Sequence, residues 1–189
     1  TTTTKASATS TPTTIRTTLP SLGGTVGITG DAKYGSTLTA DLSGVTYTPT
    51  TASDVPTYQW KRNGVDIANA TQNTYTLDVD DIGAAITVTV TADGTHATGS
   101  VTSAGTIAVD KADGASAPAA PVKESATPTS ITLVIVTGQE YSKDNGVTWQ
   151  DSPTFTGLTP DTDYSFVTRI KATTTTKASA TSTPTTIRT

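Results

Sequence analysis

Apolar and polar residues alternate over much of this chain, and short turn signals interrupt the alternation. In the segment ITVTVT, Ile86, Val88 and Val90 occupy every second position, with threonines between them. A period of two predicts a strand that buries one face. No window shows sustained apolar spacing of three and four residues, so we expect little or no helix.

The same pattern predicts further strands at residues 37–40, 58–62, 74–79 and 100–109 in the first half of the chain. Tyr75, Leu77 and Val79 are expected to share one face. Asn63-Gly64 is a strong hairpin signal, because both central turn residues accept positive φ. In the second half, we expect strands at residues 131–136, around 155 and at 165–172, with a hairpin over 141–150. Residues 131–136, ITLVIV, are apolar enough for a core, and the spacing of strands and turns predicts β-sandwiches.

One long segment, YQWKRNGVDIANATQNTYTLDVDDIGAAITVTVTA, resembles the bacterial Ig-like repeats of large surface proteins. The hallmarks are a YQWKR-type strand, an N-G turn, a TYTL strand, an acidic D-x-G corner and the ITVTVT strand. Trp60, as a single buried Trp on a central strand, fits the same plan. The resemblance covers roughly residues 24–109 and implies a spacer or an adhesive stalk.

Residues 158–164, LTPDTDY, resemble the L-x-P-x-T-x-Y signature of fibronectin type III domains. The resemblance implies that Tyr164 packs at a corner before a long strand and that its hydroxyl bonds back to the backbone. Leu158 and Pro160 are its implied packing companions. The chain departs from that family because Trp149 follows the hairpin instead of lying on an early strand, which leaves the pairing of residues 143–150 open. The string YS-x-D-x-G-x-TWQ is also similar to repeats that accompany Ig-like repeats in giant bacterial surface proteins.

Composition narrows the functional class. Hydrophobic residues make up 33% and aromatic residues 5%, which favours small sandwiches with thin cores. The net charge is -4 and the 12 basic residues are scattered, which argues against nucleic-acid binding. No apolar run approaches the roughly 18 residues of a membrane span. A threonine-rich, acidic chain without cysteine is typical of bacterial surface proteins, and the lack of Met and of a signal peptide indicates a mature fragment or an excised piece.

Residues 1–17 and residues 173–189 both read TTTTKASATSTPTTIRT. Seventeen identical positions at an offset of 172 residues are not chance. We expect an all-β fold of two tandem Ig-like and fibronectin III-like β-sandwiches, at residues 18–109 and 110–189, with a linker over 110–121. Residues 1–17 are then the terminal strand of a preceding repeat in a tandem array. Strand exchange with a neighbouring molecule, and an accident of where the sequence was cut, remain alternatives.

Candidate catalytic chemistry is sparse, because the chain has no Cys and a single His. His96 follows the Asp93-Gly94 turn and is expected to be an exposed loop residue. The carboxylates of Asp78, Asp80, Asp81, Asp161 and Asp163 are expected to cap corner turns, with Ca²⁺ binding as the alternative. We therefore predict no enzyme, no catalytic, cofactor-binding or metal site, and no cofactor.

Sugar-related features form a last group. Tyr34, Tyr47 and Trp149 are interpreted as half-buried core residues, or alternatively as an aromatic platform for sugar. Asn69-Ala70-Thr71 fits the N-glycosylation sequon, and residues 173–176 and 181–186 offer threonines either to O-linked sugar or to plain strand formation. The asparagines lie mainly at turns, which argues against an isopeptide cross-link; they are Asn63, Asn69, Asn73 and Asn145.

Together these features predict a structural repeat unit of an extracellular surface filament or stalk. The expected partners are copies of the same chain, joined in a tandem array or head to tail by strand pairing. The alternative is an adhesin module that binds glycan or a cell-surface partner.

Overall fold

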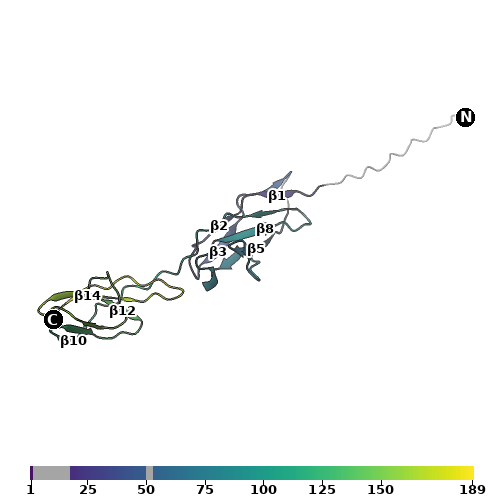
Figure 1. The fold of residues 1–189 in the computed structure, drawn as a ribbon. Coiled ribbons are helices and arrows are strands. Elements are labelled where there is room, and N and C mark those ends of the chain that lie inside the picture. Colours follow the sequence, from purple (N-terminus) through teal and green to yellow (C-terminus); the bar gives the residue numbers. More distant parts are fainter. Residues whose placement is uncertain (2–17, 50–52) are drawn as a thin grey trace.

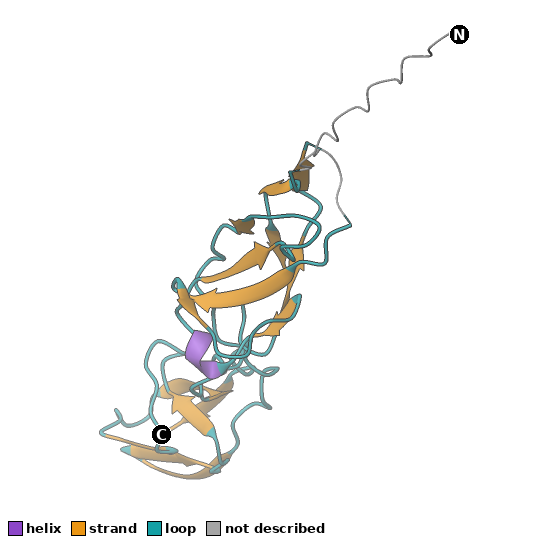
Figure 2. Cartoon of the chain, turned by 90° about the vertical axis from the view of Figure 1, so that its right-hand side faces the viewer, coloured by secondary structure: helices purple, strands orange, loops and turns teal. Residues whose placement is uncertain are grey.

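The computed structural model describes residue 1, residues 18–49 and residues 53–189. Within them the chain is all-β apart from one 3-10 turn, η1 (Val79–Asp81). Figures 1 and 2 show two groups of strands placed end to end. The strands are β1 (Ser21–Gly24), β2 (Gly27–Thr29), β3 (Thr37–Asp41), β4 (Val45–Thr48), β5 (Thr57–Arg62), β6 (Val65–Asp66), β7 (Thr74–Thr76), β8 (Ile86–Thr91), β9 (Ser100–Thr102), β10 (Lys123–Thr127), β11 (Ser130–Leu133), β12 (Gln139–Ser142), β13 (Thr154–Thr156), β14 (Asp163–Ile170) and β15 (Thr185–Arg188).

Strands β1 to β9 form the first unit. Its two main sheets have the orders β2-β3-β7 and β6-β5-β8-β9, and β1 pairs separately with β4. In the lettering of an Ig domain these orders are A-B-E and C′-C-F-G. Strands β10 to β15 form the second unit, with the orders β10-β11-β13 and β12-β14-β15, which are A-B-E and C-F-G. The chain is therefore two tandem Ig-like and fibronectin III-like β-sandwiches.

The core of the first unit is centred on Trp60, as predicted. Trp60 is fully buried, and its indole N–H donates to the carbonyl of Gln72 at 2.9 Å. Every apolar residue of ITVTVT is buried, and Asn63 and Gly64 adopt φ of 48° and 83° in the predicted hairpin. Val79 was predicted to share a strand face with Tyr75 and Leu77, and this is wrong. Strand β7 ends at Thr76, and Val79 lies exposed in η1. The predicted closing strand is also shorter, since β9 ends at Thr102.

The core of the second unit is smaller, and its members are Ile131, Leu133, Tyr141, Phe155, Leu158, Phe166 and Ile187. The prediction of one core strand over residues 131–136 is wrong in its second half. Strand β11 ends at Leu133, and the side chains of Val134, Ile135 and Val136 are 43%, 70% and 46% exposed. The chain leaves the sheet there to reach the turn before β12, so the apolar run extends beyond the strand.

The two cores share no residue. The boundaries at residues 17/18 and 109/110 remain predictions, and the predicted terminal strand at residues 1–17 lies, apart from Thr1, outside the described residues. No helix in the described ranges is long and apolar enough to cross a membrane.

Candidate functional site

The acidic corner of the first unit is built around η1. Asp78 caps it by accepting from the Val79 N–H at 2.7 Å, and Asp81 accepts from the Asp78 N–H at 2.8 Å. Asp81 is fully buried and also binds Arg62 Nε at 2.7 Å and the Tyr75 hydroxyl at 2.8 Å. Burial, and then the hydrogen bond to Asp81, raises the pKa of Tyr75 to about 12. The predicted capping is confirmed for Asp78 and Asp81, whereas Asp80 is exposed and lies 4.0 Å from Arg62. Within the described part of the chain no cluster of three metal-ligating side chains is found.

His96 lies in the loop after the Asp93-Gly94 turn, with its side chain 54% exposed, as predicted. Asp93 organises this loop: its carboxylate accepts from the backbone N–H groups of Thr95 and His96, both at 2.7 Å. Its other oxygen lies 2.6 Å from His96 Nδ1. The backbone N–H of His96 contributes most to holding the pKa of Asp93 far below its usual value. The contacts of His96 are those of a turn residue.

The corner of the second unit contains Tyr164, whose hydroxyl accepts from the Thr159 backbone N–H at 2.9 Å. This confirms the role implied by the fibronectin III resemblance. Leu158 is buried in the core beside it, whereas Pro160 is exposed and lies outside that core.

The three aromatic residues considered for a sugar platform do not share a surface. Tyr47 packs against the first core, and its hydroxyl donates to Asp54 at 2.8 Å. Trp149 belongs to the second unit, where the Arg169 guanidinium lies 4.1 Å from the centre of its ring. Tyr34 lies near the linker, with its N–H donating to the carbonyl of Asp110. All three are half-buried, as the first interpretation predicts, and Tyr47 packs against a core.

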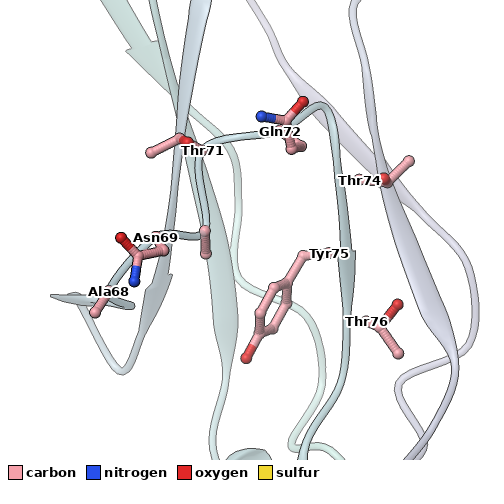
Figure 3. A pocket seen from close by; sticks show the side chains of 8 residues that line it. Ala68, Asn69, Thr71, Gln72, Thr74, Tyr75 and Thr76 are labelled. Carbon is pink, nitrogen blue, oxygen red and sulfur yellow. The ribbon is translucent and has the colours of Figure 1, made fainter.

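Two adjoining open hollows of about 290 and 420 Å³ lie on the first unit and share Thr71 and Gln72 in their linings. Figure 3 shows the smaller of the two. Asn69 of the sequon lines the smaller one and is exposed, with φ of 61°. Asn73 lines the larger one. The amides of Gln59, Asn63, Gln139 and Gln150 form hydrogen bonds within the protein. The described residues offer the side-chain amides of Asn69, Gln72 and Asn73 no such partner, so these amides are available to solvent or a ligand.

The linker between the units is paired with both of them. Asp110 exchanges hydrogen bonds with the first unit, since its N–H donates to Ala32 O and its carbonyl accepts from Tyr34, both at 2.8 Å. In the second unit, the Ala112 N–H donates to Thr175 O and the Ala112 carbonyl accepts from the Lys177 N–H, both at 2.9 Å. The backbone N–H and carbonyl groups of Asp110 and Ala112 are thus used as in a sheet.

Two salt bridges, which we call the crossed ion pairs, run over the same linker. Asp113 follows the part paired with the second unit but binds Lys33 of the first unit at 2.6 Å. Asp110 is paired with the first unit but binds Lys177 of the second. Hydrogen bonding to Lys33 and to Lys177 lowers the pKa of Asp113 and of Asp110, respectively. Gly114 then passes so close to the second unit that a Cβ there would lie 2.1 Å from the carbonyl of Ala178.

The repeated segment at residues 173–189 lies along β14 (Asp163–Ile170) and pairs with it. We call the place that this segment occupies beside β14 the strand groove. Ser179 and Ser182 are buried, and each makes a reciprocal pair with one residue of β14. The N–H of Ser182 donates to Thr168 O at 2.9 Å, and its hydroxyl accepts from the Thr168 N–H at 3.0 Å. Ser179 pairs with Ile170 in the same way, at 3.0 and 2.9 Å. Two hydroxyls three residues apart therefore fix the register.

The rest of the segment is held by packing and charge. Ile187 of β15 is 6% exposed and belongs to the core. The Thr185 hydroxyl donates to Pro121 O at 2.7 Å. Arg188 lies 3.0 Å from Asp161 and 3.7 Å from Asp163, so these two carboxylates form ion pairs with Arg188 in place of the predicted capping.

The first unit uses the same attachment for its last segment. Ser103 pairs reciprocally with Val88, through its N–H at 2.9 Å and its hydroxyl at 3.0 Å. Thr106 pairs with Ile86 at 2.9 and 3.1 Å. In both units, two hydroxyl residues three apart pair with two strand residues that are two apart. This spacing was not predicted from the sequence, because threonine was assigned to strand formation or O-linked sugar and serine was assigned no role.

No protein-family model matches the chain, and no curated protein is significantly similar to it. Among solved structures, three N-terminal domains of the highly immunogenic outer capsid protein Hoc of bacteriophage RB49 are similar at 17% identity and a TM-score of 0.39. The match covers 86% of this chain and 58% of that one, so the chain spans somewhat more than half of the Hoc structure. Consecutive titin domains match at 14% identity over 90% and 67% of the chains, with a TM-score of 0.29. The FN1–FN3 domains of chicken CNTN1 match at 16% identity over 89% and 64%, with a TM-score of 0.26.

Proposed function

We propose that this chain is a structural unit of an extracellular filament or stalk, like the bacterial surface repeats that its sequence resembles, and that it performs no catalysis. The observation that carries the proposal is the linker. A spacer must hold successive modules at a fixed angle, and here the linker is hydrogen-bonded on both sides and spanned by the crossed ion pairs. Flexibility between modules is the ordinary expectation where the interface is small.

The backbone pairing contributes more to this rigidity than the ion pairs do. Exposed ion pairs of this kind stabilise a protein little, because water and salt screen them. The pairing of Ala112 with Thr175 and Lys177 depends on a close approach that only glycine permits at residue 114. Gly114→Val is therefore expected to detach the linker from the second unit.

The test measures the distance between spin labels on the two units. The chain lacks cysteine, so Val65→Cys and Val147→Cys, at positions 71% and 80% exposed, supply unique labelling sites. We expect one narrow distance distribution in the otherwise unchanged chain, a broad one with Gly114→Val, and modest broadening with Lys33→Gln/Lys177→Gln. Lys61→Gln/Lys171→Gln, which removes ion pairs away from the linker, is the matched control. A broad distribution in the otherwise unchanged chain would contradict the proposal.

A second candidate function, adhesion to glycan, is favoured by the two hollows. The free amides that line them can both donate and accept hydrogen bonds, as sugar hydroxyls do. The one charged residue in the linings is Asp54, and its carboxylate already accepts hydrogen bonds from the Tyr47 hydroxyl and the Asp93 N–H. A neutral sugar is the ligand class that fits. Binding to an array of neutral oligosaccharides is expected to fall at least tenfold in Asn69→Ala/Gln72→Ala/Asn73→Ala and to stay unchanged in Asn145→Ala, and equal binding by both variants would exclude this site.

A further inference from the structure

We propose that the strand groove of the second unit is a receptor for residues 1–17 of a second copy of this chain. The inference rests on the filament role proposed above and names a joint by which copies connect. Residues 1–17 carry the same letters as the segment that now lies in the groove, so Ser7, Ser10, Ile15 and Arg16 correspond to Ser179, Ser182, Ile187 and Arg188. Identical side chains offer the groove identical partners.

Several contacts in the strand groove require particular side chains of the segment that occupies it. The hydroxyls of Ser179 and Ser182 satisfy backbone N–H groups of β14, and a residue without a hydroxyl would leave those buried donors unpaired. Ile187, which lies opposite Tyr164 in the sheet, belongs to the core, and Arg188 forms ion pairs with the carboxylates of Asp161 and Asp163. A segment that binds in the strand groove must supply two hydroxyls three residues apart, followed by an apolar residue and a basic residue. Residues 1–17 contain all four at the same spacing.

Residues 1–17 cannot reach the groove of their own chain. Ile15 is three steps along the chain from Thr18, and an extended chain spans at most about 3.6 Å per step, or about 11 Å in all. The first unit alone, along the six residues of β8, is about 20 Å long, and the groove lies beyond it and the linker. The acceptor must therefore be another molecule.

The direction of the groove makes the joint head to tail. Thr189 lies at the end of the second unit remote from the linker (Figure 1). Thr17 of a donor would take that place, and the donor's first unit would continue outward from it. Such a contact joins two different surfaces and forms an open chain of molecules. The order of units along that chain is the same as in a covalent tandem array.

In the isolated molecule the groove is already filled by residues 173–189. Chain connectivity gives this resident segment an effective concentration of the order of millimolar, so dilute molecules stay monomeric. The joint is therefore latent, and it forms when the resident segment is weakened.

The test weakens only the resident copy. Ile187→Asp places a charge in the core, whereas Ile15 of the donor copy stays intact. Light scattering after size exclusion is expected to show concentration-dependent oligomers for Ile187→Asp and monomers for Ile15→Asp/Ile187→Asp. Ile107→Asp, at a position 81% exposed, is the matched control and should stay monomeric. Oligomers that persist in the double variant, or monomers in the single one, would overturn the proposal.

A peptide with the sequence of residues 1–17 separates strand binding from simple misfolding. The fluorescent peptide is expected to bind Ile187→Asp at least tenfold more tightly than the unchanged chain and to convert the oligomers to monomers. A Ser7→Ala/Ser10→Ala peptide should do so at least tenfold less well, and equal binding of both peptides would overturn the proposal. The spin-label distances in the monomer test the spacer role separately, so either idea can fail alone.

Discussion

The two units share the strand orders A-B-E and C-F-G, to which the first unit adds C′ and the β1–β4 pair, but they fix the connection between their E and F strands with different chemistry. In the first unit, between β7 and β8, Asp81 is fully buried. It forms an ion pair with Arg62 and accepts hydrogen bonds from the Tyr75 hydroxyl and the Asp78 N–H. In the second, between β13 and β14, the Tyr164 hydroxyl accepts one backbone N–H. A buried charge is tolerated only when several partners surround it, whereas a single neutral hydrogen bond replaces one to water with little net gain. The same corner is therefore sensitive to mutation in one unit and tolerant in the other.

The largest expected effect tests whether the units are independent. Trp60→Ala removes the centre of the first core and is expected to destabilise that unit by about 4 kcal/mol. Because Trp149 is then the one remaining Trp, its fluorescence reports the second unit alone during denaturant unfolding. The second transition should stay at the denaturant concentration seen in the unchanged chain. A shift of both transitions together would show that the linker couples the two cores.

The charged corner should give the next largest effect. Asp81→Ala leaves Arg62, the Tyr75 hydroxyl and the Asp78 N–H without their shared partner, which is expected to cost about 3 kcal/mol in the first unit. Asp80→Ala is the control, because Asp80 is 75% exposed and lies 4.0 Å from Arg62, and it should change stability by no more than about 0.5 kcal/mol. Equal effects in urea unfolding would contradict the assignment of Asp81 as the centre of the corner.

The tyrosine corner should be less sensitive. Tyr164→Phe removes one hydrogen bond and leaves the packing, so we expect a loss of stability well below that of Asp81→Ala and confined to the second unit. Thermal unfolding followed by circular dichroism would show it as a lower midpoint of one transition. A loss as large as that of Asp81→Ala would remove the contrast between the two corners.

The smallest effects concern pH and have opposite signs in the two units. Hydrogen bonds from the hydroxyls of Ser142 and then Thr148 lower the pKa of Asp144 from 3.8 to about 2, so its contribution is present above pH 3.8 and lost as pH falls toward 2. The pKa of Tyr75 is raised from 10.0 to about 12, so its contribution is present below pH 10 and lost as pH rises toward 12. Denaturant unfolding as a function of pH should show Asp144→Asn flattening the acid dependence of the second unit and Tyr75→Phe the alkaline dependence of the first. An unchanged pH profile in either variant would exclude that group as the cause.

Features that depend on local pattern were predictable from the sequence. The period of two in ITVTVT, the Asn63-Gly64 turn and the central Trp60 are all found where the pattern puts them. The bond from the Thr159 backbone to the Tyr164 hydroxyl followed from the family resemblance.

Features that depend on where the chain leaves a sheet were not predictable. Val134, Ile135 and Val136 are as apolar as a core strand, and hydrophobicity alone does not say that β11 stops at Leu133. The same holds for the linker, whose composition predicts a loop although its backbone is paired on both sides. Of the candidate sites, the corner at Asp78 was predictable and Asn69 belongs to a recognisable sequon, whereas Gln72, Asn73 and the serine pairs gave no recognisable motif.

The placement of β15 has a mechanical consequence. The second unit is entered through the linker next to β10 and is left at Thr189 after β15, at its opposite end (Figure 1). A pull between these ends runs along the strands, so the hydrogen bonds of β15 to β14 and the two serine pairs are loaded in parallel and must break together. Tension applied in this way therefore loads the repeated segment, which is also the segment with a duplicate at the other end of the chain.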